Sequence, residues 1–324
     1  MGFTSFKGLW SEMSGRGAGL NMVVWSLMSA LSVGGAVGCG VEPSLQETAA
    51  NMETQSRAQR EGNGLSLNGL SLNGLSLNGL SLNGLSLNGL STEDFAKWFN
   101  ANIEGHSALM SYMVLCAVPL GETRHFENPA TGMAYTWVGG LGLAPEWSGG
   151  KPATEVEQQL VSACLAAHVN NYKLHVPISV LGEDAQGTPI PYTEEELTTF
   201  AQNESCFFGN VFTTLNPGLF AGNDRGSLDP TQSTPRPCGL TGLGGESHPA
   251  CPQIQRIGQC SDHCVLAPGD KYYAECTYKE KTYKMITTRI RTEDVHTCGD
   301  GVCQVGERKG SGYTADSCSL DCGT

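Results

Sequence analysis

The stretch Thr154-Glu-Val-Glu-Gln-Gln-Leu-Val-Ser-Ala-Cys-Leu-Ala-Ala-His-Val169 has the pattern of a helix that packs into the interior of a domain. Apolar residues of one face recur at three- and four-residue spacing, namely Val156, Leu160, Cys164 and Ala167. A second stretch, about His106–Val118, is apolar nearly all round and carries Cys116. We therefore predict two buried helices, and we expect a Cys116–Cys164 disulfide between them.

Three segments around these helices alternate as strands do. Gly121–Val138 predicts a hairpin with its turn between two short strands. Leu174–Val180 predicts a single strand, and Pro177 within it indicates an edge position because proline cannot donate to a sheet. Lys271–Thr292 predicts a last hairpin, with its turn near Lys279-Glu280-Lys281.

Two further helices and one long loop complete the folded region. Ser91 is placed to cap a helix that carries Asp94 at its third position. Thr193 and Glu196 match a capping box for a helix that runs to about Gln202. Residues 209–270 are rich in Gly and Pro and contain four cysteines, which predicts a long loop stapled by disulfides. Helices and short strands in mixed order indicate an α+β domain over residues 91–296.

The N-terminus has the layout of an export signal. Residues 1–21 carry Lys7 and Arg16, an apolar run covers Met22–Val33, and small residues follow to Gly38. The apolar run is too short to span a membrane as a mature helix. We therefore interpret residues 1–38 as a signal peptide and expect the chain to be exported.

The segment Ala36-Val37-Gly38-Cys39 resembles a bacterial lipobox. The resemblance implies cleavage before Cys39, acylation of its thiol, and attachment to the outer membrane or the cell surface. More than one acyl chain makes such an anchor stable. The family pattern favours leucine where this chain has Ala36. The alternative is ordinary signal-peptide cleavage, which gives a secreted protein without a lipid anchor.

The number of cysteines agrees with a modified Cys39. The chain has 13 cysteines, so that an even set remains once Cys39 is acylated. In an exported protein an even set predicts disulfides without a leftover thiol. The disulfide candidates are Cys116, Cys164, Cys206, Cys238, Cys251, Cys260, Cys264, Cys276, Cys298, Cys303, Cys318 and Cys322.

A tether separates Cys39 from the folded region. Residues 39–62 are polar and poor in aromatics, which is typical of a disordered linker. Residues 63–91 repeat the pentapeptide Asn-Gly-Leu-Ser-Leu, whose period fits neither a helix nor a strand. The repeat partly resembles pentapeptide-repeat β-solenoids, but so few copies stack poorly. We expect a flexible spacer that reaches about 90 Å when extended; the rival role is binding or self-association through its leucines.

Residues 297–324 form a separate cysteine-rich segment. Cys298-Gly-Asp-Gly-Val-Cys303, then Gly306-Glu307, then Cys318-Ser-Leu-Asp-Cys322 resemble the short CGDGxC…GE…CxxDC module of exported bacterial proteins. Four cysteines allow three pairings. Four carboxylates offer oxygen ligands for a calcium ion, namely Asp300, Glu307, Asp316 and Asp321. The alternative is that these acids cap turns or face water.

The sequence holds no familiar catalytic motif: His-Glu-x-x-His, Gly-x-Ser-x-Gly and a Walker-type phosphate loop are all missing. His168 ends a helix and His175 lies on a strand, so we interpret both as structural. Cys260-Ser-Asp-His-Cys264 with His248 and Cys251 could bind zinc, but exported thiols favour disulfides. A hydrolase would instead need His125, His168 or His175 to meet carboxylates in a deep pocket.

Charge narrows the choice of partners. A net charge of −13 disfavours nucleic acid, because an acidic protein repels phosphate. The one basic island is the hairpin 271–291, where lysines and arginines alternate with tyrosines and could bind an anionic glycan or lipid headgroup. Its alternative role is an edge strand defended by lysine. The sequence thus predicts an envelope lipoprotein with a structural or binding role and no enzymatic activity; the alternative is a secreted or anchored hydrolase.

Overall fold

The computed structural model describes residues 90–324 except 171, 173–175, 214–217, 250, 311–312 and 324. The expected signal peptide, the linker and the repeat spacer up to residue 89 lie outside the described residues. The described part is a mixed helix and strand structure with six disulfides, so the predicted α+β, disulfide-rich class is confirmed. None of the helices in it has the length and apolar character that a membrane span needs.

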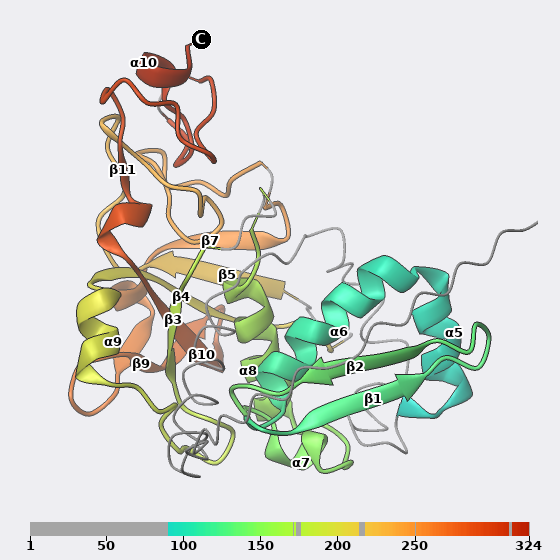
Figure 1. Cartoon of the computed structure of the whole chain (residues 1–324). Helices are drawn as coiled ribbons and strands as arrows, with labels where there is room; N and C mark the ends of the chain where they lie inside the picture. The colour runs from blue at the N-terminus through green and yellow to red at the C-terminus, as the bar shows by residue number, and fades with distance from the viewer. Residues whose placement is uncertain are drawn as a thin grey trace, which may run out of the picture. The chain divides into compact units, whose positions relative to one another are not determined.

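A seven-stranded sheet forms the centre of the described region, with the strand order β7-β5-β4-β10-β9-β8 and β3 beside β10 (Figure 1). Its strands are β3 (Ser179–Gly182), β4 (Gln202–Asn210), β5 (Gly218–Asn223), β7 (Ile254–Gln259), β8 (Cys264–Leu266), β9 (Tyr273–Tyr278) and β10 (Lys281–Ile290). Neighbours are antiparallel except β5 and β7. The long β10 pairs with β9 along its first half and with β3 along its second half.

Helix α8 (Glu155–Ala167) packs on β4 and β10, and α6 (Ile103–Ala117) packs against α8 (Figure 1). Thr154 and Glu157 form a reciprocal capping box at the start of α8. The predicted apolar face of α8 is too narrow, because every side chain from Leu160 to Ala167 is buried. A helix covered by the sheet on one side and another helix on the other needs no polar face.

The first helix, α5 (Glu93–Ala101), packs with the hairpin of β1 (Thr123–Glu127) and β2 (Ala134–Val138). The predicted hairpin 121–138 is therefore confirmed. Ser91 was the wrong cap: the Thr92 side chain accepts from Phe95 N–H instead. Aromatic rings of α5 and the hairpin contact each other at 4.8–5.9 Å between centroids, namely Phe95, Phe99, Phe126, Tyr135 and Trp137.

Helices α9 and α7 and strand β3 are short elements of the domain. In α9 (Glu194–Thr199) the Thr193 cap is confirmed, but Glu196 accepts from the Ser179 hydroxyl rather than from its own helix start. The buried Glu157 carboxylate caps the start of helix α7 (Pro145–Ser148), where it accepts hydrogen bonds from two backbone N–H groups. Strand β3 starts at Ser179, and among the described strands it pairs only with β10, as expected for an edge.

Residues 202–270 depart most from the prediction. They contribute β4, β5, β7 and β8 to the sheet, where the sequence pattern predicts a helix end and a stapled loop. All side chains from Glu204 to Asn210 are buried, and a strand buried on both faces shows no alternation. The last hairpin is confirmed, with its turn at Lys279-Glu280, where both residues have positive φ. It is not at an edge, since β4, β3 and β8 flank it.

The C-terminal segment is tied back to the domain. Strand β11 (His296–Thr297) pairs with β6 (Gln232–Ser233), and a 3-10 turn (η3, Thr292–Asp294) precedes it. The segment ends in the short helix α10 (Ser319–Cys322). Its disulfides are Cys298–Cys318 and Cys303–Cys322, an interleaved arrangement that is one of the three open pairings.

Candidate functional site

All twelve disulfide candidates are paired. The pairs are Cys116–Cys164, Cys206–Cys260, Cys238–Cys251, Cys264–Cys276, Cys298–Cys318 and Cys303–Cys322. The predicted bridge between the two buried helices is thus confirmed. Thiols that are joined in disulfides cannot ligate zinc, and no described group of metal-ligating side chains joins His248 to Cys251, Cys260 or Cys264. Six disulfides are typical of a protein that folds in an oxidising compartment outside the cytoplasm.

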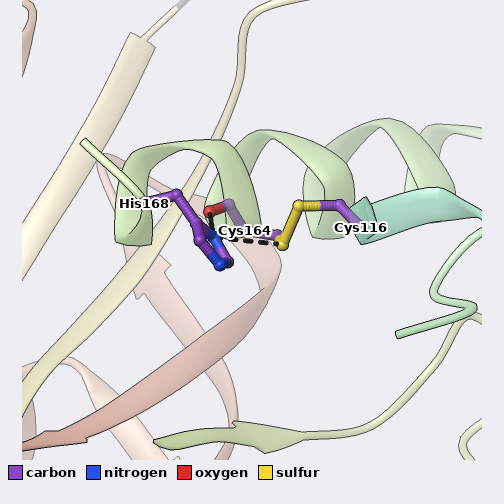
Figure 2. Close-up of side chains that lie close together, drawn as sticks. All are labelled: Cys116, Cys164 and His168. Carbon is purple, nitrogen blue, oxygen red and sulfur yellow. Dashed lines mark hydrogen bonds between the residues drawn. A yellow bond between two sulfur atoms is a disulfide. The ribbon is translucent and has the colours of Figure 1, made fainter. Parts of the chain in front are cut away.

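His168 lies beside the Cys116–Cys164 disulfide at the end of α8, in the interior of the domain (Figure 2). Its Nδ1 lies 2.8 Å from the Cys164 carbonyl oxygen and 3.7 Å from the Cys164 Sγ. Burial lowers the pKa of His168 to about 4, and the charge of Arg236 acts in the same direction. The imidazole is therefore neutral, is enclosed and donates to a backbone carbonyl, which suits a structural role.

The other two histidines of the hydrolase hypothesis do not join it. His125 lies on the outer face of β1, where its ring nitrogens contact the hydroxyls of Thr123 and Thr136. His175 is outside the described residues. In the described part of the chain, therefore, His125 and His168 do not form the cluster around one pocket that would favour the hydrolase.

A different histidine meets a carboxylate. His248 Nε2 lies 3.0 Å from Asp316 Oδ1, and both side chains are buried. Burial alone would raise the pKa of Asp316, but hydrogen bonds from His248 and Tyr172 outweigh it and hold that pKa below its ordinary value. Arg308 Nε adds a longer ion pair at 3.6 Å. Sequence reasoning missed this pair, because its members lie 68 residues apart and no local motif joins them.

The four proposed calcium ligands are not brought together. No described group of three side chains within 4.8 Å contains more than one of them. Asp321 accepts from the backbone N–H of Gly299 and Gly301, and Asp300 accepts from that of Val302. Glu307 accepts from the Ser233 hydroxyl and the Gln304 N–H. These contacts match the alternative in which the acids cap turns, and calcium stays a prediction.

Most basic side chains of the hairpin 271–291 already pair with other groups of the protein. Lys281 and Lys284 pair with Glu155 and Glu183, at 2.7 and 3.7 Å. Arg289 donates hydrogen bonds to backbone carbonyls, and Arg291 pairs with Glu293 and Asp294. Three tyrosines of the hairpin are buried, namely Tyr272, Tyr273 and Tyr283. Burial, with nearby Asp224, raises the pKa of Tyr273 to about 12. Lys271 and Lys279 are exposed.

An open groove of about 360 Å³ lies between the start of α8 and the hairpin. We call it the hairpin groove; its lining residues are Glu155, Val156, Gln159, Glu275, Lys281, Thr282, Tyr283 and Lys284. The Gln159 side-chain oxygen Oε1 accepts a hydrogen bond from the Lys284 backbone N–H, which fixes the helix against β10. Carboxylate, amide, ammonium and hydroxyl groups thus face one space. Such a lining can form hydrogen bonds with a polyhydroxylated ligand.

A fully buried ion pair lies in the interior of the described region, and the sequence did not reveal it. Arg236 donates to Glu204 at 2.5 and 2.9 Å, and both side chains are at most 1% exposed. Arg236 also donates to the Ala167 carbonyl at the end of α8. The pair joins β4, α8 and the segment that carries Cys238. Both side chains are buried, so the pair holds these three segments together in the interior of the domain.

Comparison with protein-family models, with curated proteins and with solved structures finds no match to this chain. The case for a function therefore depends on the residues themselves.

Proposed function

We propose that the protein is an exported lipoprotein, anchored through Cys39, that holds a disulfide-locked binding domain at the cell envelope. One observation carries the proposal. All twelve cysteines from Cys116 to Cys322 pair with one another, so the odd cysteine of the chain is Cys39. The lipobox resemblance independently assigns that cysteine to the lipid, and the disulfides agree with a location outside the cytoplasm.

The test is the fate of Cys39 in a bacterial host that processes lipoproteins. We expect the mature chain to begin at Cys39 with a mass increased by acyl groups, and to fractionate with membranes. Cys39→Ser should abolish both, whereas Ala36→Leu, which brings the segment closer to the lipobox pattern, should keep both. An unmodified Cys39, or membrane association that survives Cys39→Ser, would show a secreted protein or another mode of attachment.

The binding role is assigned to the hairpin groove, whose polar lining suits a glycan. Lys281 and Lys284 supply cations for an anionic glycan or lipid headgroup if the ligand displaces Glu155 and Glu183. Heparin, dextran and phosphatidylglycerol vesicles serve as probes for the anionic, neutral and lipid cases. We expect Lys281→Gln with Lys284→Gln to weaken heparin binding at least tenfold. The control Lys309→Gln, which changes an exposed lysine outside the groove, should not.

A hydrolase remains the second candidate because of one observation. His248, which pairs with Asp316, lines a cavity of about 190 Å³ that Thr241, Ser247 and Thr314 also line. The Ser247 hydroxyl, however, donates to the Ile254 carbonyl and accepts from the Arg256 N–H, so it is held by the backbone. Hydrolysis of ester, peptide or glycoside substrates that is lost in His248→Ala, with folding retained, would favour the enzyme.

A further inference from the structure

Two disulfides lie in contact inside the sheet. Cys206–Cys260 joins β4 to the 3-10 turn η2 (Cys260–Asp262), and Cys264–Cys276 joins β8 to β9. The Sγ atoms of Cys264 and Cys206 are 3.8 Å apart. The Sγ atoms of Cys206, Cys264 and Cys276 all lie within 4.8 Å of one another. We call these two bonds the contacting disulfides.

The local fold explains why four sulfurs meet here. Cys260 is the first residue of the η2 turn and Cys264 begins β8 directly after it, which brings the two bonds close together. Cys264 and Cys276 are direct partners in the register of β8 and β9. Gly222 in β5 makes the space: a Cβ there would lie 3.0 Å from the Cys206 Sγ and 3.2 Å from the Cys260 Sγ. Any side chain at this position would push on the Cys206–Cys260 bond.

The two contacting disulfides differ in their exposure to solvent. Cys206 and Cys260 are fully buried, in a cluster with Phe208 and Phe220. Cys264 is partly exposed, on strand β8 at the edge of the sheet, and the next residue, Val265, is 63% exposed. Cys276 is buried, so a small thiol from solution approaches the Cys264–Cys276 bond through Cys264, whereas the Cys206–Cys260 bond has no exposed member. The sulfur contact is the route between them.

We propose that these four cysteines form a thiol–disulfide exchange site whose substrate is a small external thiol. Two molecules of that thiol reduce the Cys264–Cys276 bond to two thiols and are themselves oxidised to their disulfide. The Cys264 thiolate then attacks the Cys206 Sγ. A Cys206–Cys264 bond forms, the Cys206–Cys260 bond breaks, and its electron pair leaves on Cys260, which takes up a proton.

The exchange conserves the number of disulfides after the first reduction. It frees Cys260 and Cys276 and transfers the covalent link of β4 from η2 to β8. A thiol that is buried in the oxidised protein, Cys260, is released without direct contact with the reductant. The edge of the sheet formed by β8 and η2 thus changes its cross-links in response to thiols.

The variant Cys276→Ser tests the attack without any reductant, because it leaves Cys264 as a free thiol beside the Cys206–Cys260 bond. Alkylation followed by non-reducing peptide mapping should find two forms, one with free Cys264 and one with free Cys260. The conversion should be fast at pH 8 and slow at pH 5, because the thiolate is the attacking species. The control Cys322→Ser leaves Cys303 free with no second disulfide converging on it among the described residues, and should give one form.

The wild-type chain provides the second measurement, which stands even if Cys276→Ser does not fold. After limited treatment with reduced glutathione, we expect alkylated Cys260 and Cys276 together with a Cys206–Cys264 linked peptide. Alkylated Cys264 and Cys276 with Cys206–Cys260 intact at every stage would overturn the proposal. Neither result depends on the lipid anchor or on the hairpin groove, so the outcomes of the two proposals are separable.

Discussion

The single side chain of His168 makes the stability of the fold depend on pH. The folded state keeps its imidazole neutral with a pKa of about 4, while the unfolded chain takes up the proton near 6.5. The unfolded state therefore binds more protons between these values, and stability falls as the pH drops from about 6.5 to 4. At higher pH both states are neutral and the group contributes nothing to the pH dependence.

We expect His168→Gln to flatten this part of the stability profile. The difference in unfolding free energy between pH 7 and pH 4 should decrease by up to about 3 kcal/mol relative to wild type. The measurement is urea unfolding at a series of pH values. An unchanged slope in the variant would mean that other groups, such as Asp316, cause the acid sensitivity.

Removal of one partner of the buried Glu204–Arg236 pair should destabilise the fold strongly. Glu204→Gln leaves the guanidinium of Arg236 buried without a countercharge, and removal of one partner of a buried pair typically costs about 3–5 kcal/mol. The matched control is Glu122→Gln, because Glu122 is 52% exposed and pairs with Arg124 at 3.0 Å. We expect the control to change the free energy of unfolding by less than about 1 kcal/mol. Equal effects would contradict the assignment of Glu204 to the core.

At the scale of elements, the Cys116–Cys164 bond fixes α6 to α8 across 48 residues of chain. Replacement of both cysteines by alanine should cost about 2–4 kcal/mol, mostly because the unfolded chain gains freedom. Thermal and urea unfolding measure the loss. Replacement of Cys303 and Cys322 by alanine is the control, since that bond lies within the C-terminal segment. We expect the control to leave the stability of the α6–α8 core unchanged.

The sequence predicts helices and hairpins well where the spacing of apolar residues, a capping residue or a clear turn marks them. Helices α5, α6, α8 and α9 and both long hairpins are present near their expected positions. Strands β4 and β5 could not be seen, because a buried strand lacks alternation and glycines such as Gly222 weaken its signal. The glycine is needed there for the disulfide, a reason that only the tertiary structure provides.

At the scale of the whole molecule, the sites were the least predictable part. The even set of disulfides and the Cys116–Cys164 pair follow from composition and helix pattern. The Glu204–Arg236 and His248–Asp316 pairs join residues 32 and 68 positions apart, and nothing local marks them. The four acids near the C-terminus have the composition of a calcium site, yet backbone N–H groups use several of their oxygens.

The cross-links also shape the state that the molecule adopts when it unfolds. The six disulfides join positions 12 to 54 residues apart, so a chain that loses its helices and strands remains a set of closed loops. Such a chain exposes less surface to denaturant than a linear one, and the slope of its urea unfolding curve should be shallow for its length. Size-exclusion chromatography in concentrated urea should show a smaller hydrodynamic radius before addition of a reductant than after it.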